Sequence, residues 1–255
     1  AGVLRDDGHG AVHVCHAPIQ AQPALRCQYL GAGPVHWLVI GRLPVCSIGT
    51  GYAAPMSRII AGRARGAQLR APAGERTRPT TDRVREALFS MLATWAGAAD
   101  AAPEEQFAGV RLLDLYAGSG AIGLEAVSRG ASRAVLVENH RHALESIRHN
   151  VAATRLADRV QVRPLSVATF LAGSPEPFDV VWLDPPYSTD TAEVEAVLAR
   201  VTEGWLAGDG LVVVERSRRD PMPRWPSALA DNWTRRYGET QLHFGRPAAD
   251  PEGGQ

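Results

Sequence analysis

Residues 114–123 read Asp-Leu-Tyr-Ala-Gly-Ser-Gly-Ala-Ile-Gly. They come at the end of an apolar stretch, residues 110–116, that the pattern predicts as a strand, and they open a predicted helix over residues 121–129. The three glycines fit the Gly-x-Gly-x-x-Gly spacing of a strand-turn-helix that binds a nucleotide. The stretch therefore predicts the first unit of an open α/β sheet.

The alternation of strands and helices continues from this turn toward the C-terminal end, where a hairpin-like stretch at residues 233–244 closes it. Such alternation predicts a doubly wound, parallel, Rossmann-like sheet with right-handed crossovers. The hairpin would add an antiparallel edge strand. The expected strands are residues 133–138, 159–163, 178–183 and 210–215, and the expected helices are residues 141–154, 167–171 and 191–201.

The composition is that of a globular protein: of the 255 residues, 45% are hydrophobic and 21% are charged. The formal net charge is zero, so a nucleic-acid-binding face requires an uneven distribution of charge. Cys15, Cys27 and Cys46 are the only cysteines, which excludes a cysteine nucleophile or a thiolate metal site after residue 55 and fits a cytoplasmic protein. No apolar run reaches the roughly 18 residues of a membrane span.

The chain is expected to have four parts. Residues 1–55 carry few charges and show no sustained period, so we expect a disordered or non-native extension, with Met56 as the natural start. Residues 56–98 are expected to form a hairpin and then a helix, with N-cap chemistry at Thr80-Thr81-Asp82. Residues 108–246 hold the alternating pattern, and residues 247–255 are expected to be a disordered tail.

Arginines cluster between Met56 and Arg85, where eight of them accompany only two acidic residues. Clustered guanidinium groups suit contacts with phosphates, so the segment is a candidate nucleic-acid interface. A solvated face in an arginine-rich protein is the alternative. The candidate RNA-binding residues are Arg58, Arg63, Arg65, Arg78, Arg83 and Arg85.

A second motif follows the apolar stretch 178–183, where the sequence reads Asp184-Pro185-Pro186-Tyr187. The Asp184 carboxylate and the Pro185 carbonyl can accept hydrogen bonds from a delocalised NH2 group, and Tyr187 can stack on a planar ring. The prolines fix φ and lack N–H donors, so the loop holds these acceptors in place. The motif favours methylation of a planar amine, although a turn without function can have the same residues.

Two cofactors compete for the glycine turn. The spacing from Gly118 to Glu138 suits the ribose of a dinucleotide, so hydride transfer is an alternative. Asp114 would repel a pyrophosphate but attract the ammonium and sulfonium groups of S-adenosylmethionine, and the second motif also favours methyl transfer. No metal site is expected, because no Cys or acid pair accompanies the histidines at 140, 142 and 149. The candidate cofactor-binding residues are Asp114, Tyr116, Gly118, Gly120, Glu138 and Ser166.

Both motifs, together with three further stretches, resemble the bacterial small-subunit rRNA guanine-N2 methyltransferases over residues 56–246. The resemblance implies a class I S-adenosylmethionine-dependent methyltransferase whose N-terminal segment binds RNA. It implies that the substrate is a guanine of 16S rRNA, in the small ribosomal subunit or its assembly intermediate, and that Asp184, Pro185 and Tyr187 form the catalytic loop. It also implies that the protein is a cytoplasmic monomer that binds neither a membrane nor a metal. The further stretches are Arg58-Ile-Ile-Ala-Gly62, Thr77-Arg-Pro-Thr-Thr-Asp-Arg-Val-Arg-Glu-Ala-Leu-Phe89 and Gly123-Leu-Glu-Ala-Val-Ser-Arg-Gly-Ala131.

Other functions fit the same residues. The N6 amine of adenine in DNA and the glutamine amide of a protein are also delocalised, so both are alternative acceptors. Glutamine enzymes usually have Asn where this chain has Asp184, and they do not need the arginine-rich start. An RNA-binding assembly factor without catalysis is a third alternative, and failure to bind S-adenosylmethionine would support it.

Overall fold

The computed structural model describes residues 36–40, 43–47, 57–72 and 82–248, and the chain divides into two compact units, Ala1–Ala53 and Ala54–Gln255. In the first unit, β1 (His36–Ile40) and β2 (Leu43–Ser47) pair as antiparallel strands. The sequence predicted no regular structure here, but the valine, leucine and isoleucine residues of this stretch suit strands. The expected start at Met56 lies outside the described residues.

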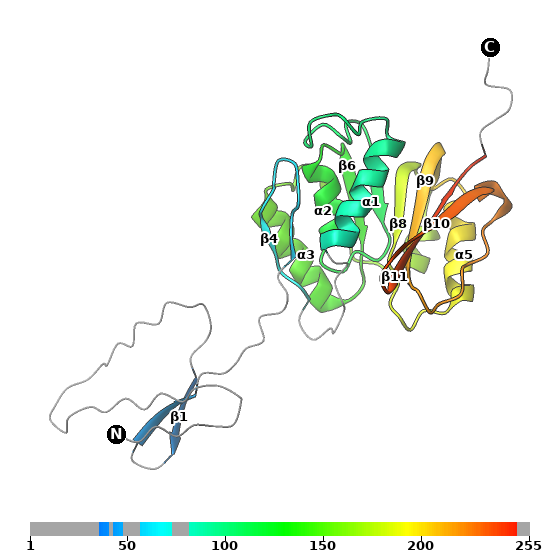
Figure 1. Ribbon diagram of the computed structural model, residues 1–255. Coiled ribbons are helices and arrows are strands. Elements are labelled where there is room, and N and C mark those ends of the chain that lie inside the picture. The colour runs from blue at the N-terminus through cyan, green and yellow to red at the C-terminus, as the bar shows by residue number, and fades with distance from the viewer. Residues whose placement is uncertain (1–35, 41–42, 48–56, 73–81, 249–255) are drawn as a thin grey trace. The chain divides into compact units, whose positions relative to one another are not determined.

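The second unit contains a seven-stranded sheet in the order β10-β11-β9-β8-β5-β6-β7 (Figure 1). Neighbouring strands run parallel from β9 to β7, whereas β11 runs antiparallel to both of its neighbours. The strands are β5 (Arg111–Asp114), β6 (Arg133–Val137), β7 (Val160–Arg163), β8 (Phe178–Leu183), β9 (Leu206–Ser217), β10 (Asp231–Tyr237) and β11 (Thr240–Arg246).

Helices cover both faces of this sheet, as the predicted doubly wound class requires. Side chains of β8 alternate between two apolar clusters, so that Trp182 packs with residues of α1, α2 and α3, and Leu183 packs with residues of α4 and α5. The predicted fold class is therefore confirmed, and β8, α3, α4 and α5 have the predicted bounds. The helices are α1 (Asp82–Trp95), α2 (Ala121–Ser128), α3 (Arg141–Thr154), α4 (Val167–Leu171), α5 (Thr191–Val201) and the short 3-10 helix η1 (Ser227–Leu229).

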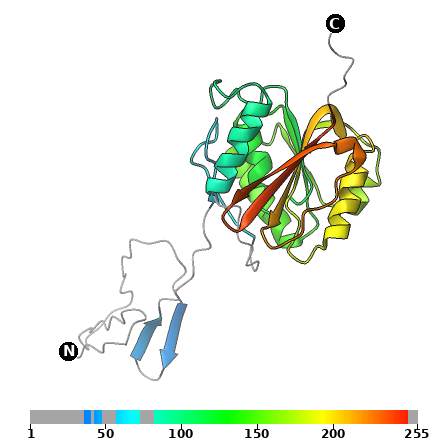
Figure 2. The ribbon, with the colours of Figure 1, turned by 45° about the vertical axis from the view of Figure 1, so that its right-hand side comes forward.

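The expected closing hairpin is present, and its strand β10 forms an edge of the sheet and pairs antiparallel with β11. The strand β11 returns between β9 and β10, so the edge strand β10 is parallel to β9. The cause is the long connection over residues 218–230, which carries the chain beyond the position that β11 later occupies. Figure 2 shows the hairpin in orange and red, with α1 on one side and α5 on the other.

The segment predicted as an N-terminal hairpin and helix shares the core of the second unit. The strands β3 (Ser57–Arg58) and β4 (Gln68–Leu69) pair antiparallel, and α1 begins at Asp82. Ile59 and Leu69 are fully buried in the same apolar cluster as Phe89 of α1 and Leu112 of β5. This segment is therefore built onto the sheet domain. None of the helices in the described ranges combines the length and apolar character needed to cross a bilayer.

Candidate active site

The Asp-Pro-Pro-Tyr loop begins where β8 ends, at the carboxyl edge of the sheet. Asp184 is half-buried and Pro185 is buried, whereas the Tyr187 side chain is exposed over 70% of its surface. The loop forms one wall of a pocket of about 270 Å³, and the other wall comes from the end of β9 and the start of β11. An acceptor, an exposed ring and a cavity therefore lie together. The pocket is lined by Asp184, Pro185, Tyr187, Glu215, Arg216, Ser217, Arg219, Asp220, Glu239 and Thr240.

The surroundings of Asp184 raise its pKa well above the ordinary value. Burial is the largest cause, and the neighbouring carboxylates Glu215 and Asp114 raise the pKa further, while Arg216 opposes them. A carboxylate with a raised pKa is a better proton acceptor than an ordinary one. Asp184 therefore combines hydrogen-bond acceptance with the capacity to take up a proton at the pocket.

Arg216 holds the Asp-Pro-Pro-Tyr loop in place from the neighbouring strand. Its side chain is only 7% exposed. Its Nε atom lies 3.0 Å from Asp220 Oδ2, and its Nη2 atom donates to the carbonyl oxygen of Thr189 at 2.9 Å. The Thr189 amide in turn donates to the Pro186 carbonyl at 2.9 Å. The loop after β8 is thereby tied to the end of β9.

Asp114 lies at the end of β5, adjacent to β8, and is 1% exposed. Burial raises its pKa to about 8, Glu138 raises it further, and backbone amides of Tyr116 and Gly123 oppose the shift. Its Oδ1 atom is buried and has no hydrogen-bond partner. A buried acceptor without a donor is costly, and a ligand with an ammonium group would supply that donor. The residues present therefore fit the cationic end of S-adenosylmethionine.

The glycine turn leads from β5 into α2 and positions a second carboxylate. The Gly118 amide donates to Glu138 Oε2 at 2.8 Å, and Glu138 Oε1 accepts from the amides of Asn139 at 2.9 Å and His140 at 2.8 Å. Gly120, the N-cap of α2, has a φ of 79°, a conformation that side chains disfavour. A Cβ at Gly118 would meet nothing within 4 Å, so the turn has an open side for a ligand.

The two weaker cofactor candidates have structural contacts of their own. Tyr116 is half-buried against the apolar cluster of α4 and α5, and burial raises its pKa to about 12. Ser166 follows β7 and caps α4, because its Oγ atom accepts from the Thr169 amide at 3.1 Å. Their contacts with a cofactor stay a prediction.

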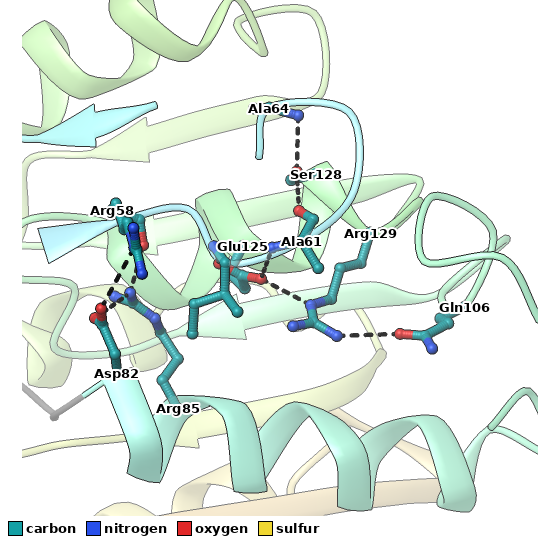
Figure 3. Close-up of polar contacts among 10 residues, drawn as sticks. Arg58, Ala61, Ala64, Asp82, Arg85, Gln106, Glu125, Ser128 and Arg129 are labelled. Atoms are coloured by element: carbon teal, nitrogen blue, oxygen red, sulfur yellow. Dashed lines mark hydrogen bonds and ion pairs between the residues drawn. The ribbon is translucent and has the colours of Figure 1, made fainter. Parts of the chain in front are cut away.

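The loop between β3 and β4 is fastened to α2 by a buried carboxylate and a hydroxyl (Figure 3). Glu125 Oε2 accepts from the Ile60 amide at 2.7 Å, and Glu125 Oε1 accepts from the Ala61 amide at 3.0 Å. Ser128 Oγ donates to the Ala61 carbonyl at 2.6 Å and accepts from the Ala64 amide at 3.0 Å. The loop is therefore held in a fixed position on the domain.

This attachment leaves most of the predicted RNA-binding arginines on the surface, but it buries one of them. Arg58, Arg63, Arg65 and Arg83 are exposed. Arg85 is only 1% exposed, and its guanidinium donates to Ser57 Oγ at 2.7 Å and to Asp82 Oδ1 at 2.9 Å (Figure 3). The prediction for Arg85 is therefore wrong, because its charge is used inside the protein. Arg78 and the N-cap residues Thr80-Thr81 lie outside the described residues.

Asn150 of α3 connects the N-terminal segment to the glycine turn. Its Oδ1 atom accepts from the Arg70 amide at 2.8 Å, and its Nδ2 atom donates to the carbonyls of Arg70 at 3.0 Å and Ser119 at 2.9 Å. The side chain is completely buried. The segment that follows β4 is thus coupled to the candidate cofactor loop.

The sequence interpretation missed the half of the pocket that β9 supplies. Glu215 and Arg216 end an apolar run, Leu211 to Val214, in the same way that Asp184 ends β8. The apolar run followed by charged residues can be read from the sequence. Only the pairing of β8 with β9, however, shows that the carboxyl ends of these two strands lie together. Within the part of the chain that the structure describes, no three His, Cys, Asp or Glu side chains gather closely enough to hold a metal ion.

A parallel sheet with a glycine turn after β5 and an Asp-Pro-Pro-Tyr loop after β8 defines a Rossmann-like class I methyltransferase. Comparison with known proteins agrees. The family model described as Conserved hypothetical protein 95 matches residues 57–246, and the chain belongs to this family. The family predicted from the sequence is confirmed by the relatives described next.

Ribosomal RNA small subunit methyltransferase D of Escherichia coli (strain K12) is 36% identical over 177 residues, which cover 69% of this chain and 81% of that protein. The putative rRNA methyltransferase YlbH of Bacillus subtilis (strain 168) is 34% identical over 187 residues, which cover 72% and 95% of the two chains. Among solved structures, the putative methyltransferase yhhF from Escherichia coli is 32% identical with a TM-score of 0.64, covering 76% of this chain and 99% of that one.

Proposed function

We propose that this protein transfers a methyl group from S-adenosylmethionine to the exocyclic N2 of a guanine in 16S rRNA. The observation that carries the proposal is the Asp-Pro-Pro-Tyr loop, which opens on a pocket at the end of β8. Asp114 and the glycine turn lie one strand away, at the end of β5, and Glu138 lies two strands away, after β6. The names of the relatives from Escherichia coli and Bacillus subtilis support rRNA as the substrate class.

Three residues would hold the cofactor, which supplies a methyl group on a good leaving group when it is bound. Asp114 has a buried oxygen without a donor and suits the ammonium group. The Gly118 backbone leaves room for close approach, and Glu138 is oriented by three amides. Because each carboxylate oxygen can accept more than one hydrogen bond, Glu138 retains capacity for ribose hydroxyls on Oε2.

The residues of the loop would orient the base and accept its proton. The Asp184 carboxylate and the Pro185 carbonyl accept from the N2 amine, which draws the nitrogen lone pair toward the methyl group. Tyr187 is exposed and can stack on the guanine after the base leaves its helix. When the new N–C bond forms, the nitrogen becomes acidic, and the raised pKa of Asp184 suits it to take that proton.

The exposed arginines would bind the phosphates around the target. The positive charges that attract the RNA would be those of Arg58, Arg63, Arg65 and Arg83. Because the loop between β3 and β4 is fixed, it would hold the bound RNA in one orientation. The substrate is then the small ribosomal subunit or its assembly intermediate, and the protein acts in the cytoplasm as a monomer. Arg78, which lies outside the described residues, is also proposed to bind RNA.

Methyl transfer to four acceptors tests the proposal: deproteinised rRNA, small subunits that lack the modification, duplex DNA and a release factor. Labelled S-adenosylmethionine is the donor, and the product nucleoside is identified and mapped by mass spectrometry. N2-methylguanine in the subunit or its RNA is expected. Label in DNA or protein, or none while the cofactor binds, would overturn the substrate. The variant Asp184→Ala should bind the cofactor as the wild type does but should not turn over.

A further inference from the structure

The loop that carries Arg63 and Arg65 lies away from the pocket at the end of β8. The Arg63 amide donates at 2.8 Å to the carbonyl of Ser128, which is the last residue of α2. The helix α2 begins after β5 at the carboxyl edge of the sheet and returns the chain to the start of β6 at the opposite edge. A nucleotide whose base enters the pocket therefore needs other groups to bind its own phosphates.

A second arginine-rich stretch reaches the pocket from β9. Residues 216–246 hold seven arginines but only three acidic residues. Two of these acids form ion pairs with arginines of the same stretch, and the third, Glu239, is exposed. Arg218 and Arg219 are also exposed, and Arg219 lines the pocket together with Asp184. Two positive charges therefore lie at the rim of the pocket, where β9 ends.

The turn that carries Arg218 and Arg219 is fixed by buried contacts. The Asp220 amide donates to the Ser217 carbonyl at 3.0 Å, which closes a four-residue turn with the two arginines at its centre. Gln241 is only 5% exposed, and its Nε2 atom donates to the carbonyls of Ser217 and Asp220, both at 3.2 Å. The Arg218 amide donates at 2.8 Å to a carbonyl of the turn between β10 and β11. The backbone that presents both guanidinium groups is thus ordered before any ligand binds, which lowers the cost of binding.

Phosphates are the groups of an RNA substrate that this rim suits. When a base turns out of its helix into a pocket, its sugar and the two phosphates that flank it stay at the entrance. The carboxylates of Asp184 and Glu239 line the pocket and would repel those phosphates. Guanidinium groups match the geometry of phosphate oxygens and can bind them through two hydrogen bonds. Arg218 and Arg219 therefore offset the repulsion at the point where the backbone has to approach.

We propose that Arg218 and Arg219 bind the phosphates that flank the target guanine and so hold its nucleotide at the pocket. This inference rests on the proposed function, since it names the RNA groups that the same site contacts. The arginines of the loop between β3 and β4 then bind phosphates further from the target. The two sets of contacts are separate, so their effects on methyl transfer are expected to be independent.

The test uses the form of the RNA that the labelling experiment shows to be methylated. It is prepared in two versions, one with natural phosphates and one with uncharged methylphosphonates on both sides of the target guanine. The rates of methyl transfer give kcat/KM for each version, and their ratio measures what the two flanking charges contribute. We expect the wild type to lose about tenfold or more on the methylphosphonate version, because hydrogen bonds to charged groups are lost.

The double variant Arg218→Gln with Arg219→Gln should have a kcat/KM on natural RNA that is lower by about tenfold or more. It should lose less than about twofold further on the methylphosphonate version, because the partners of the missing charges are already gone. Arg218→Lys with Arg219→Lys retains the charges and should retain most of the methylphosphonate effect. Arg63→Gln with Arg65→Gln should be slower on both versions and should keep the full methylphosphonate effect.

The matched control is Arg200→Gln with Arg224→Gln, which removes the same charge from exposed positions where each arginine forms an ion pair with a glutamate. It should keep the wild-type values. S-adenosylmethionine affinity, measured by calorimetry, should be the same in all variants.

A methylphosphonate effect in Arg218→Gln with Arg219→Gln equal to that of the wild type would overturn the role of these arginines. A loss of S-adenosylmethionine affinity in that variant would also overturn it, because the arginines would then serve the carboxylate of the cofactor. If the wild type methylates none of the acceptors in the labelling experiment, the proposed function itself fails, and this inference fails with it.

Discussion

Replacing Glu125 by glutamine should loosen the loop between β3 and β4. Both oxygens of this fully buried carboxylate are used: Oε2 accepts from Ile60, and Oε1 accepts from Ala61 and, at 2.7 Å, from Arg129 Nε. Glutamine has nearly the same shape but only one acceptor oxygen. Its NH2 group therefore points at an N–H donor whichever way the amide is turned, and Arg129 loses its ion-pair partner.

The expected loss follows from the contacts that are broken. A hydrogen bond to a charged group contributes about 1.5–3 kcal/mol, and removing one partner of a buried ion pair costs about 3–5 kcal/mol. The free energy of unfolding should therefore fall by about 3–5 kcal/mol. For a domain of this size that corresponds to a decrease in Tm of about 10 °C. The contacts of Ser128 with Ala61 and Ala64 are unchanged, so complete detachment of the loop is not expected.

Urea denaturation measures the stability, and limited digestion with trypsin reports the loop directly, because Arg63 and Arg65 are exposed trypsin sites within it. Cleavage at these sites should be faster in Glu125→Gln, and RNA affinity should fall while S-adenosylmethionine affinity stays the same. Glu86→Gln, at an exposed position of α1, is the matched control. A stability within about 0.5 kcal/mol of that control, together with unchanged cleavage, would refute the role assigned to Glu125.

Three further predictions concern RNA binding, the cofactor loop and pH. Replacing Arg63 and Arg65 together by glutamine should weaken RNA binding and reduce the slope of log K against log salt by about 1.5–2, and an unchanged slope in a filter-binding titration would remove both residues from the interface. Asn150→Ala removes the link between Arg70 and Ser119 and should weaken S-adenosylmethionine binding several-fold in calorimetry; equal affinity would show that the link does not shape the cofactor loop. Burial raises the pKa of Asp114 from 3.8 to about 8, so the folded protein retains a proton that the unfolded chain releases. Stability without cofactor should therefore fall as the pH rises from about 4 to about 8, and urea titrations of Asp114→Asn should lack this part of the pH dependence.

The sequence was sufficient for the features that depend on neighbouring residues. The glycine turn and the Asp-Pro-Pro-Tyr loop each follow an apolar strand, and local sequence placed both at the carboxyl edge of the sheet, where the structure has them. The burial of Arg85 also had a local signal, because Arg85 lies four residues before Phe89 on the apolar stripe of α1. The sequence interpretation gave more weight to the charge of Arg85 than to its position on the apolar stripe.

Contacts between residues that lie far apart in the sequence could not be predicted from it. Glu125 and Ser128 read as ordinary residues of a helix, and their partners lie 64 to 67 residues earlier. The position of β11 inside the sheet depends on a long connection whose path has no local pattern. For the same reason Glu215 could not be assigned to the pocket until β9 was known to pair with β8.

Four neighbouring parallel strands each have a carboxylate at or near their carboxyl ends, and the order of these strands explains how one sheet edge could serve two ligands. From β9 to β6 the acids are Glu215, Asp184, Asp114 and Glu138. The pKa values of Asp184 and Asp114 are raised first by burial and further by their neighbours along this row. Such a row is unfavourable in the protein alone, because burial and like charges both oppose ionisation. A cationic cofactor at Asp114 would relieve one part of this row, and a base whose amine donates to Asp184 would relieve the next part. Binding of the cofactor should therefore lower the cost of ionising Asp184, so cofactor and base are expected to bind with positive cooperativity.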